Sequence, residues 1–164
     1  MELKTLEKLF VRHLKSMYSS EKQLIEAMPK LVKAVSHKDL KYALKEHFEQ
    51  TKVHLERIQK ILQRLAVSKL SNDYCDVIEA LLDEADDLIE EYSPSQVLDT
   101  ELMTLFQKIE HFEIASYNTL VNYAKLLAYD EASELLQQTL DEEYEADNKF
   151  DKLTEEVINV YIKS

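Results

Sequence analysis

The chain has 164 residues, of which 32 are acidic and 20 are basic, and its formal net charge is -12 at pH 7. This charge argues against a nucleic-acid partner, because phosphate backbones are bound by clustered Lys and Arg, and equally against an anionic membrane surface. The sequence has no glycine and only two prolines, so it lacks the tight turns of sheets, and its length predicts a single all-α domain over residues 1–164.

Two long helices are predicted in the first part of the chain, over about residues 5–35 and 36–65. The link between them contains Ser36 and Asp39 in the Ser-x-x-Asp pattern of a helix start. In the first helix, apolar residues recur every three or four positions, as expected of an amphipathic helix: Leu6, Phe10, Leu14, Met17, Leu24, Met28 and Val32.

A shorter third helix is predicted over residues 74–92, after a break at residues 68–73. Its many acidic side chains are interpreted as a solvated face. Its apolar face is marked by Tyr74, Val77, Ile78, Leu81, Ala85, Leu88 and Tyr92.

The fourth helix is predicted to start at SPSQ, residues 93–96, with Ser93 as its cap and Pro94 at the first helical position. It is expected to end near residue 127, and Asp130 is predicted to cap a fifth helix. Four long helices with a shorter helical crossover describe a four-helix bundle, a fold that builds polar sites from side chains on facing helices.

The cellular compartment is suggested by three features of the sequence. The single cysteine, Cys75, cannot form an internal disulfide. The amino terminus has no apolar core of a signal peptide, and no window approaches 18 uncharged apolar residues. We therefore expect a cytoplasmic protein.

Each of the four long helices carries an ionisable side chain on the apolar stripe that is expected to face the bundle interior. Glu21 lies at the centre of this stripe in the first helix, and His47 and His54 lie on the inner face of the second. Glu113 and Glu143 occupy the corresponding stripes of the fourth and fifth helices. The sequence therefore predicts a buried polar seam.

Other polar residues lie near this seam and have two interpretations. Glu110 borders the stripe of the fourth helix and Asp147 lies one turn beyond the centre of the fifth, so each is either a metal ligand or a solvated, salt-bridged carboxylate. His47 is interpreted as a core histidine bonded to a backbone carbonyl or to Thr51. The neutral Gln50 lies at the edge of the seam.

The convergence of carboxylates predicts a bound cation. Carboxylates in an apolar interior repel one another and lose hydration, so they become neutral or require a compensating charge. Fe, Mn and Zn ions take the oxygen and imidazole ligands that these helices offer. The separation of Glu21 from His54 equals that of Glu110 from Glu143, so each helical hairpin can place its pair at one depth.

Several segments resemble the YciE/YciF family of bacterial stress-induced ferritin-like proteins, which are related to rubrerythrin. The resemblance covers nearly the whole chain. It implies a five-helix ferritin-like fold, a homodimer and a di-metal site in the bundle, with iron as the expected metal. The matching segments are YSSEKQL (18–24), MPKL (28–31), LERI (55–58), EHFEIASYNTL (110–120) and LDEEYEAD (140–147).

The resemblance also implies a set of metal ligands, with two departures from the family pattern. Ferritin-like di-iron sites generally use a Glu-x-x-His pair on each of two helices, whereas the fifth helix here has no histidine at the site. Members of the family usually carry Glu where this sequence has Gln50, so one anionic ligand is missing. The implied ligands are Glu21, His54, Glu110, Glu113, Glu143 and Asp147.

Two functions of different classes follow. The first is a ferritin-like stress-response protein that binds Fe, Mn or Zn and acts as a di-iron oxidase, as a peroxidase or in metal handling. The second is a structural or interaction protein of the same fold, with a metal-free site whose carboxylates are protonated or held by Lys and Arg. These alternatives leave open whether the protein is an enzyme.

Overall fold

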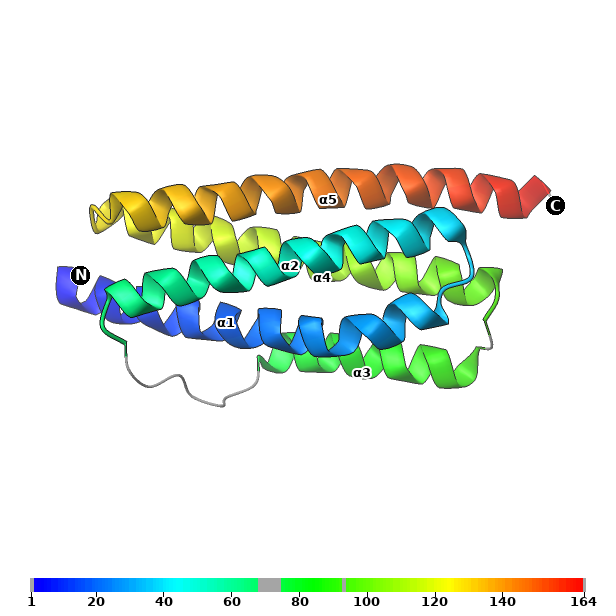
Figure 1. The fold of residues 1–164 in the computed structure, drawn as a ribbon, viewed down its shortest axis with the longest axis horizontal. Coiled ribbons are helices and arrows are strands. Elements are labelled where there is room, and N and C mark those ends of the chain that lie inside the picture. The colour runs from blue at the N-terminus through cyan, green and yellow to red at the C-terminus, as the bar shows by residue number, and fades with distance from the viewer. Residues whose placement is uncertain (1, 68–74, 93, 164) are drawn as a thin grey trace.

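The computed structural model describes residues 2–67, 75–92 and 94–163, and these residues form an all-α, ferritin-like four-helix bundle with a helical crossover (Figure 1). The five predicted helices are confirmed. No described helix is long and apolar enough to cross a membrane. The helices are α1 (Leu3–Ala34), α2 (Lys38–Arg64), α3 (Asp76–Glu91), α4 (Gln96–Leu126) and α5 (Asp130–Lys163).

The four long helices form two hairpins that pack side by side. The most extensive contacts are those of α4 with α5 and of α1 with α2, and further contacts join α2 to α5 and α1 to α4. The crossover helix α3 lies outside this bundle, against α1 and α4. It returns the chain along the length of the bundle, so that α2 and α5 run antiparallel and the two termini lie at opposite ends (Figure 1).

The starts of α4 and α5 differ from the sequence predictions. The predicted cap Ser93 lies outside the described residues, and the cap of α4 is Ser95, whose Oγ accepts a hydrogen bond from the Leu98 amide at 3.3 Å. The extended backbone of Ser95 (φ -162°, ψ 169°) brings its hydroxyl to that amide. Pro94 therefore precedes α4. Asp130 is the first residue of α5 and not its cap.

The link between α1 and α2 is held by a buried carboxylate from α4. Asp99 accepts hydrogen bonds from the backbone amides of Ser36 at 2.7 Å and His37 at 2.9 Å, and from the Tyr161 hydroxyl at 2.9 Å. The residue before α2 is His37, which makes no side-chain capping bond. The predicted helix start at Ser36 is thus wrong, because a distant side chain binds the amides of this link.

A polar layer divides the hydrophobic core into two clusters. Along α1, one cluster ends at Met17 and the other begins at Leu24, with Glu21 between them. The same interruption occurs in the middle of α2, α4 and α5. The buried polar residues therefore lie at one level of the bundle, with packed apolar side chains above and below them.

The ends of α2 and α4 require left-handed backbone at alanine, because the chain has no glycine. Ala66 and Ala128 have φ angles of 53° and 54°. In α4, the Ala128 amide donates to Lys125 O and the Tyr129 amide to Ala124 O, which is the pair of bonds of a Schellman motif. An alanine held in this conformation carries a steric cost of about 1 kcal/mol or more.

We therefore expect Ala128→Gly to stabilise the protein. Relief of the steric cost exceeds the added freedom of the unfolded chain, so the free energy of unfolding in urea should rise by about 0.5 kcal/mol. The matched control is Ala115→Gly at an exposed position inside α4, which should lower that free energy by about 1 kcal/mol. Equal losses in the two variants would contradict this account of the turn.

Candidate metal centre

The polar layer brings together five of the six ligands that the family resemblance implies. Each of these side chains comes from the middle of a long helix, where its position on the inward stripe forces it into the core. None is more than 1% exposed. They are Glu21, His54, Glu110, Glu113 and Glu143.

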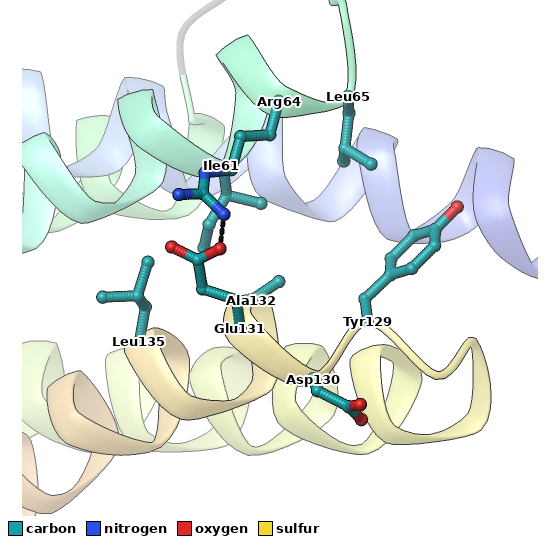
Figure 2. Close-up of a pocket in the computed structure, with 8 residues that line it drawn as sticks. All are labelled: Ile61, Arg64, Leu65, Tyr129, Asp130, Glu131, Ala132 and Leu135. Atoms are coloured by element: carbon teal, nitrogen blue, oxygen red, sulfur yellow. Dashed lines mark ion pairs between the residues drawn. The ribbon is translucent and has the colours of Figure 1, made fainter.

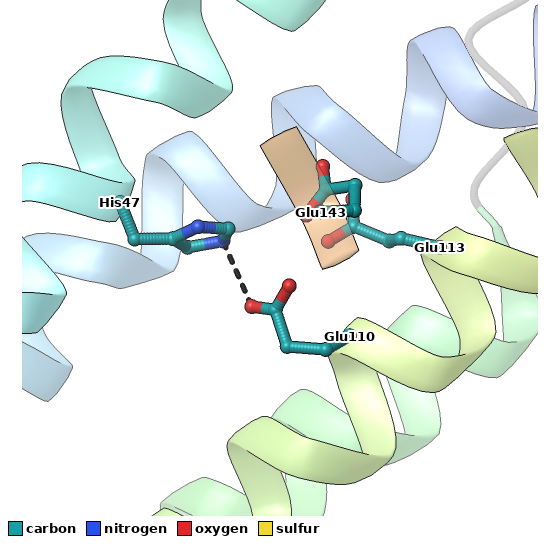
Figure 3. A group of neighbouring side chains, drawn as sticks. All are labelled: His47, Glu110, Glu113 and Glu143. Atoms are coloured by element: carbon teal, nitrogen blue, oxygen red, sulfur yellow. Dashed lines mark ion pairs between the residues drawn. The ribbon is translucent and has the colours of Figure 1, made fainter. Parts of the chain in front are cut away.

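One group of potential ligands joins three helices (Figure 3): His47 from α2, Glu110 and Glu113 from α4, and Glu143 from α5. One ligand atom of each residue lies within 4.8 Å of those of the others. His47 Nε2 is 3.2 Å from Glu110 Oε1. Because metal-ligand bonds of about 2.1 Å place opposite ligands about 4.2 Å apart, the group has the dimensions of a single-ion site.

A second group shares one carboxylate with the first. It consists of Glu21, His54 and Glu143, again with ligand atoms within 4.8 Å of one another. His54 Nδ1 lies 2.8 Å from Glu143 Oε1 and 3.9 Å from Glu21 Oε1. Glu143 is therefore common to two adjacent sets of oxygen and imidazole groups.

Residues outside this second group hold one atom of Glu21 and one atom of His54. The buried Tyr117 hydroxyl donates to Glu21 Oε1, while Glu21 Oε2 has no hydrogen-bond partner among the described residues. His54 Nε2 lies 2.9 Å from Glu142 Oε2, while Nδ1 lies 2.8 Å from Glu143 Oε1 inside the group. Each of these two side chains is thus held at one atom by a residue outside the group.

An arginine on α2 fixes the partner of His54. The guanidinium of Arg57 donates to both carboxylate oxygens of Glu142, at 2.6 and 2.8 Å, and to Thr139 Oγ1 at 3.0 Å. The bonds from Arg57, together with the contact with His54, lower the pKa of Glu142 to about 2. The ionised Glu142 then holds the ring of His54, the arrangement that commonly orients a metal-bound histidine through its second nitrogen.

Burial and crowding shift the pKa values of the carboxyl groups in different directions. Burial raises the pKa of Glu21 to about 8, and burial followed by the charge of Glu143 raises those of Glu110 and Glu113 well above the usual range. Burial alone would raise the pKa of Glu143 as well, but contact with His54 and its charge lower it. Without a cation, most of these carboxyl groups are therefore held neutral.

The histidines of the two groups also titrate differently. Burial lowers the pKa of His47, against the charge of Glu143. Burial opposes the charged form of His54 too, but its contacts with Glu142 and Glu143 prevail and raise its pKa to about 10. In the metal-free protein, His47 is a neutral imidazole and His54 is an imidazolium between carboxylates.

The buried atoms that make no hydrogen bond among the described residues show what the layer can hold. Buried polar atoms are paired in nearly all proteins, and each unpaired one costs about 1–3 kcal/mol. A cation coordinated by these atoms would satisfy them together, so the donors fit a metal ion. In the two groups these atoms are Glu21 Oε2, both nitrogens of His47, Nδ1 of His54, and both carboxylate oxygens of Glu110, Glu113 and Glu143, whose close contacts are with one another. Outside the groups, Ser20 Oγ and His37 Nδ1 are also buried and make no hydrogen bond among the described residues.

Asp147, the sixth predicted ligand, and Gln50 lie at the edge of the layer. Asp147 belongs to neither group; its carboxylate is 22% exposed and lies 3.2 Å from His111 Nε2. Gln50 is half-buried and lines a surface pocket together with His47. The structure thus places Asp147 in an ion pair on the bundle surface and Gln50 beside the layer, one turn along α2 from His47.

Three residues of the centre were not predicted as functional from the sequence. His47 was interpreted as a core residue, although its spacing of two helical turns from His54 already placed both on one face. Glu142 and Arg57 had no comparable signal, because their contact depends on how α2 and α5 are aligned. A bundle of this kind defines a ferritin-like protein with carboxylates and histidines in its interior.

Comparison with known families identifies this class more closely. Residues 5–163 match the family model described as "Domain of unknown function (DUF892)", and the chain belongs to this family. Protein YciF of Escherichia coli (strain K12) is 40% identical over 159 residues, which are 97% of this chain and 94% of YciF. The resemblance to the YciE/YciF family that the sequence indicated is therefore confirmed.

Solved structures agree with this family assignment. The crystal structure of the E. coli stress protein YciF matches with a TM-score of 0.88 at 38% identity, over 94% of this chain and 97% of that one. YcfI from Rhodopseudomonas palustris, for which a structural role has been suggested, matches with a TM-score of 0.83 at 33% identity over 89% and 92%. A protein from Xanthomonas campestris, 19% identical with a TM-score of 0.76 over 97% of each chain, shares the fold.

We expect the metal-free protein to lose stability as the pH rises from about 5 to 8. A carboxyl group whose pKa is raised by folding, such as Glu21 at about 8, binds a proton that the unfolded chain has released, so folding becomes less favourable up to that pH. The raised pKa of His54 also makes folding less favourable as the pH rises above 6.5. The lowered pKa of His47 has the opposite effect on stability, but only below pH 6.5.

Urea unfolding in a chelator at several pH values measures this effect. The slope is at most about 1.4 kcal/mol per pH unit for each proton retained. Glu113→Gln removes one buried acid, so the free energy of unfolding should fall less steeply with pH. Glu145→Gln, at an exposed position two residues after Glu143, should leave that slope unaltered. A stability that is constant or increasing across this range would refute the assigned protonation of the layer.

Proposed function

We propose that this protein is a metal-binding ferritin-like protein with two adjacent metal positions joined by Glu143. The observation that supports the proposal most directly is the convergence of buried carboxylates and histidines in two groups that share this carboxylate, with atoms that make no hydrogen bond in the part of the chain that the structure describes. His47, Glu110 and Glu113 would complete one position, and Glu21 and His54 the other.

The charges in the layer support two divalent ions. Four ionised carboxylates, those of Glu21, Glu110, Glu113 and Glu143, would balance the charge of two such ions, with both histidines neutral. The ionised Glu142 is outside this balance because Arg57 already neutralises it. Oxygen and imidazole donors together suit Fe, Mn or Zn, and iron is the metal that we propose.

The residues around the ligands would set their geometry and protonation. The bond from Tyr117 leaves Glu21 one free oxygen, and Glu142 leaves His54 only Nδ1. Glu110 and Glu113 carry protons in the metal-free layer, so binding of cations would release them. Two ferrous ions held here would supply the two electrons that, with two protons, reduce hydrogen peroxide to two molecules of water.

Metal analysis of variants tests the proposal. Untagged protein reconstituted with ferrous ion without oxygen should bind two ions per chain, and Glu143→Ala should lose both because each group loses a member. Glu21→Ala should retain one ion. Elemental analysis and circular dichroism of the same samples measure the bound metal and the fold.

Two further variants act as controls for this experiment. Asp147→Ala should bind as much metal as the unaltered protein, since Asp147 pairs with His111 outside both groups. Glu145→Ala, at an exposed position between Glu143 and Asp147, should also have no effect. An unaltered protein that binds no Fe, Mn or Zn would overturn the proposal.

A second candidate function is a structural protein of the same fold with a metal-free layer. It is favoured by the raised pKa values, which allow Glu21, Glu110 and Glu113 to remain neutral in the core, and by the structural role suggested for YcfI. If this function is correct, metal will not raise the unfolding temperature, and Glu113→Gln will not reduce the stability of reconstituted protein.

The biological setting that we propose follows the relative YciF, which is described as a stress protein. We extend that role, and a cytoplasmic homodimer, to this chain as part of the proposal. The exposed large hydrophobic side chains, which include Tyr42, Val53 and Tyr144, are distributed over all five described helices and do not select one face. Sedimentation velocity should give twice the monomer mass of 19.2 kDa.

A further inference from the structure

A small pocket opens on the surface between α2 and α5, and His47 forms part of its inner wall. Its volume is about 80 Å³. The lining also includes Ala43 and Gln50 from α2 and Ala146 from α5. We call this hollow the His47 pocket; it joins the surface to a residue whose Nε2 lies 3.2 Å from Glu110 in the polar layer.

The seam between α2 and α5 has different contacts in its middle and at this pocket. In the middle of the seam, Arg57 bridges the two helices through its bonds to Glu142 and Thr139. Further along the seam, α5 presents Ala146 about one turn beyond Glu142, and α2 presents Ala43 about three turns from His54; both side chains are small and nearly buried. Because the side chains of Ala43 and Ala146 are only methyl groups, space remains between the helices at this pocket.

The mouth of the His47 pocket is crossed by a surface ion pair. Lys149 of α5 contacts Glu46 of α2, and both side chains are about half-exposed and line the pocket. An ion pair at this exposure contributes little to stability. It can therefore separate at small cost and admit a molecule from solvent.

Another hollow between the same two helices provides a comparison (Figure 2). Its volume is about 210 Å³, and it is lined by Ile61, Arg64, Ala132 and Leu135 among others. Arg64 forms an ion pair with Glu131 across it. This hollow is larger, but no residue of its lining belongs to either group of potential ligands.

We propose that the His47 pocket is the port through which a small oxidant, dioxygen or hydrogen peroxide, reaches the buried centre. This inference rests on the proposed metal-binding function and adds to it the route by which the oxidant reaches the layer. A cavity of about 150 Å³ holds one benzene molecule, so a pocket of about 80 Å³ has room for a molecule of two heavy atoms and is too small to enclose an aromatic ring.

The first test needs no metal. Dissolved oxygen is paramagnetic and speeds the relaxation of methyl protons that it approaches, so NMR of metal-free protein under oxygen pressure reports its location. The methyl groups of Ala43 and Ala146 should relax severalfold faster than those of Ala85 and Ala124, which are buried away from this pocket. Equal relaxation of all four methyl groups would overturn the proposal.

The second test measures the reaction of iron-loaded protein with hydrogen peroxide in a stopped-flow instrument. Ala146→Leu fills the pocket and should slow oxidation of the bound iron severalfold, with the amount of iron unchanged. Lys149→Ala removes the ion pair at the mouth of the pocket and should make oxidation of the bound iron faster. The second variant alters an exposed residue, so it remains informative if the leucine disturbs the fold.

Matched controls lie at the larger hollow between the same helices. Ala132→Leu and Arg64→Ala make the same chemical changes there and should leave the rate unaltered. If the protein binds no metal, the proposed function fails and the port fails with it. If metal binds and Ala146→Leu and Lys149→Ala both react at the unaltered rate, only the port is overturned.

Discussion

The burial of four glutamates at one level of the bundle is the constraint on which the rest of the structure depends. Taking a carboxylate out of water costs several kcal/mol unless it is paired or neutralised, while a folded domain is stable by only about 5–15 kcal/mol. Four uncompensated charges would exceed that stability. The carboxyl groups of Glu21, Glu110, Glu113 and Glu143 must therefore be protonated, paired with a charged histidine as Glu143 is with His54, or compensated by cations.

The two apolar clusters and the contacts at the edges of the layer keep its side chains in place. Leucine, isoleucine and phenylalanine side chains on both sides fix the depth of each helix. Arg57 and Glu142 then orient His54, and Tyr117 orients Glu21. These bonds fix one atom each of His54 and Glu21 from outside the two groups, which is the arrangement expected of a preorganised metal site.

The helices and much of the layer were predictable from the sequence because both depend on local periodicity. Helical periodicity placed Glu21, Glu113 and Glu143 at the centres of inward faces, and all three are buried. It did not decide between the alternatives for Glu110 and Asp147, which both lay near edges. In the structure, Glu110 is buried beside His47, while Asp147 pairs with His111.

Helix ends were predicted less well, since they depend on backbone geometry and on distant partners. The segment at residues 93–96 contains two serines, and only the extended backbone of Ser95 identifies it as the cap of α4. Likewise, Ser36 matched a helix-start pattern, but its amide and that of His37 bind Asp99, a residue more than sixty positions away. No local pattern contains that information.

The sequence by itself determined the class of fold, the number of helices and the presence of a buried polar seam, because hydrophobic periodicity and the lack of glycine act locally along the chain. Only the tertiary structure decided that His47 joins Glu110, that Glu142 holds His54 under the control of Arg57, and that a pocket opens beside Ala43 and Ala146. These features arise from the alignment of α2 with α4 and α5, and that alignment is set by side-chain packing over the whole bundle.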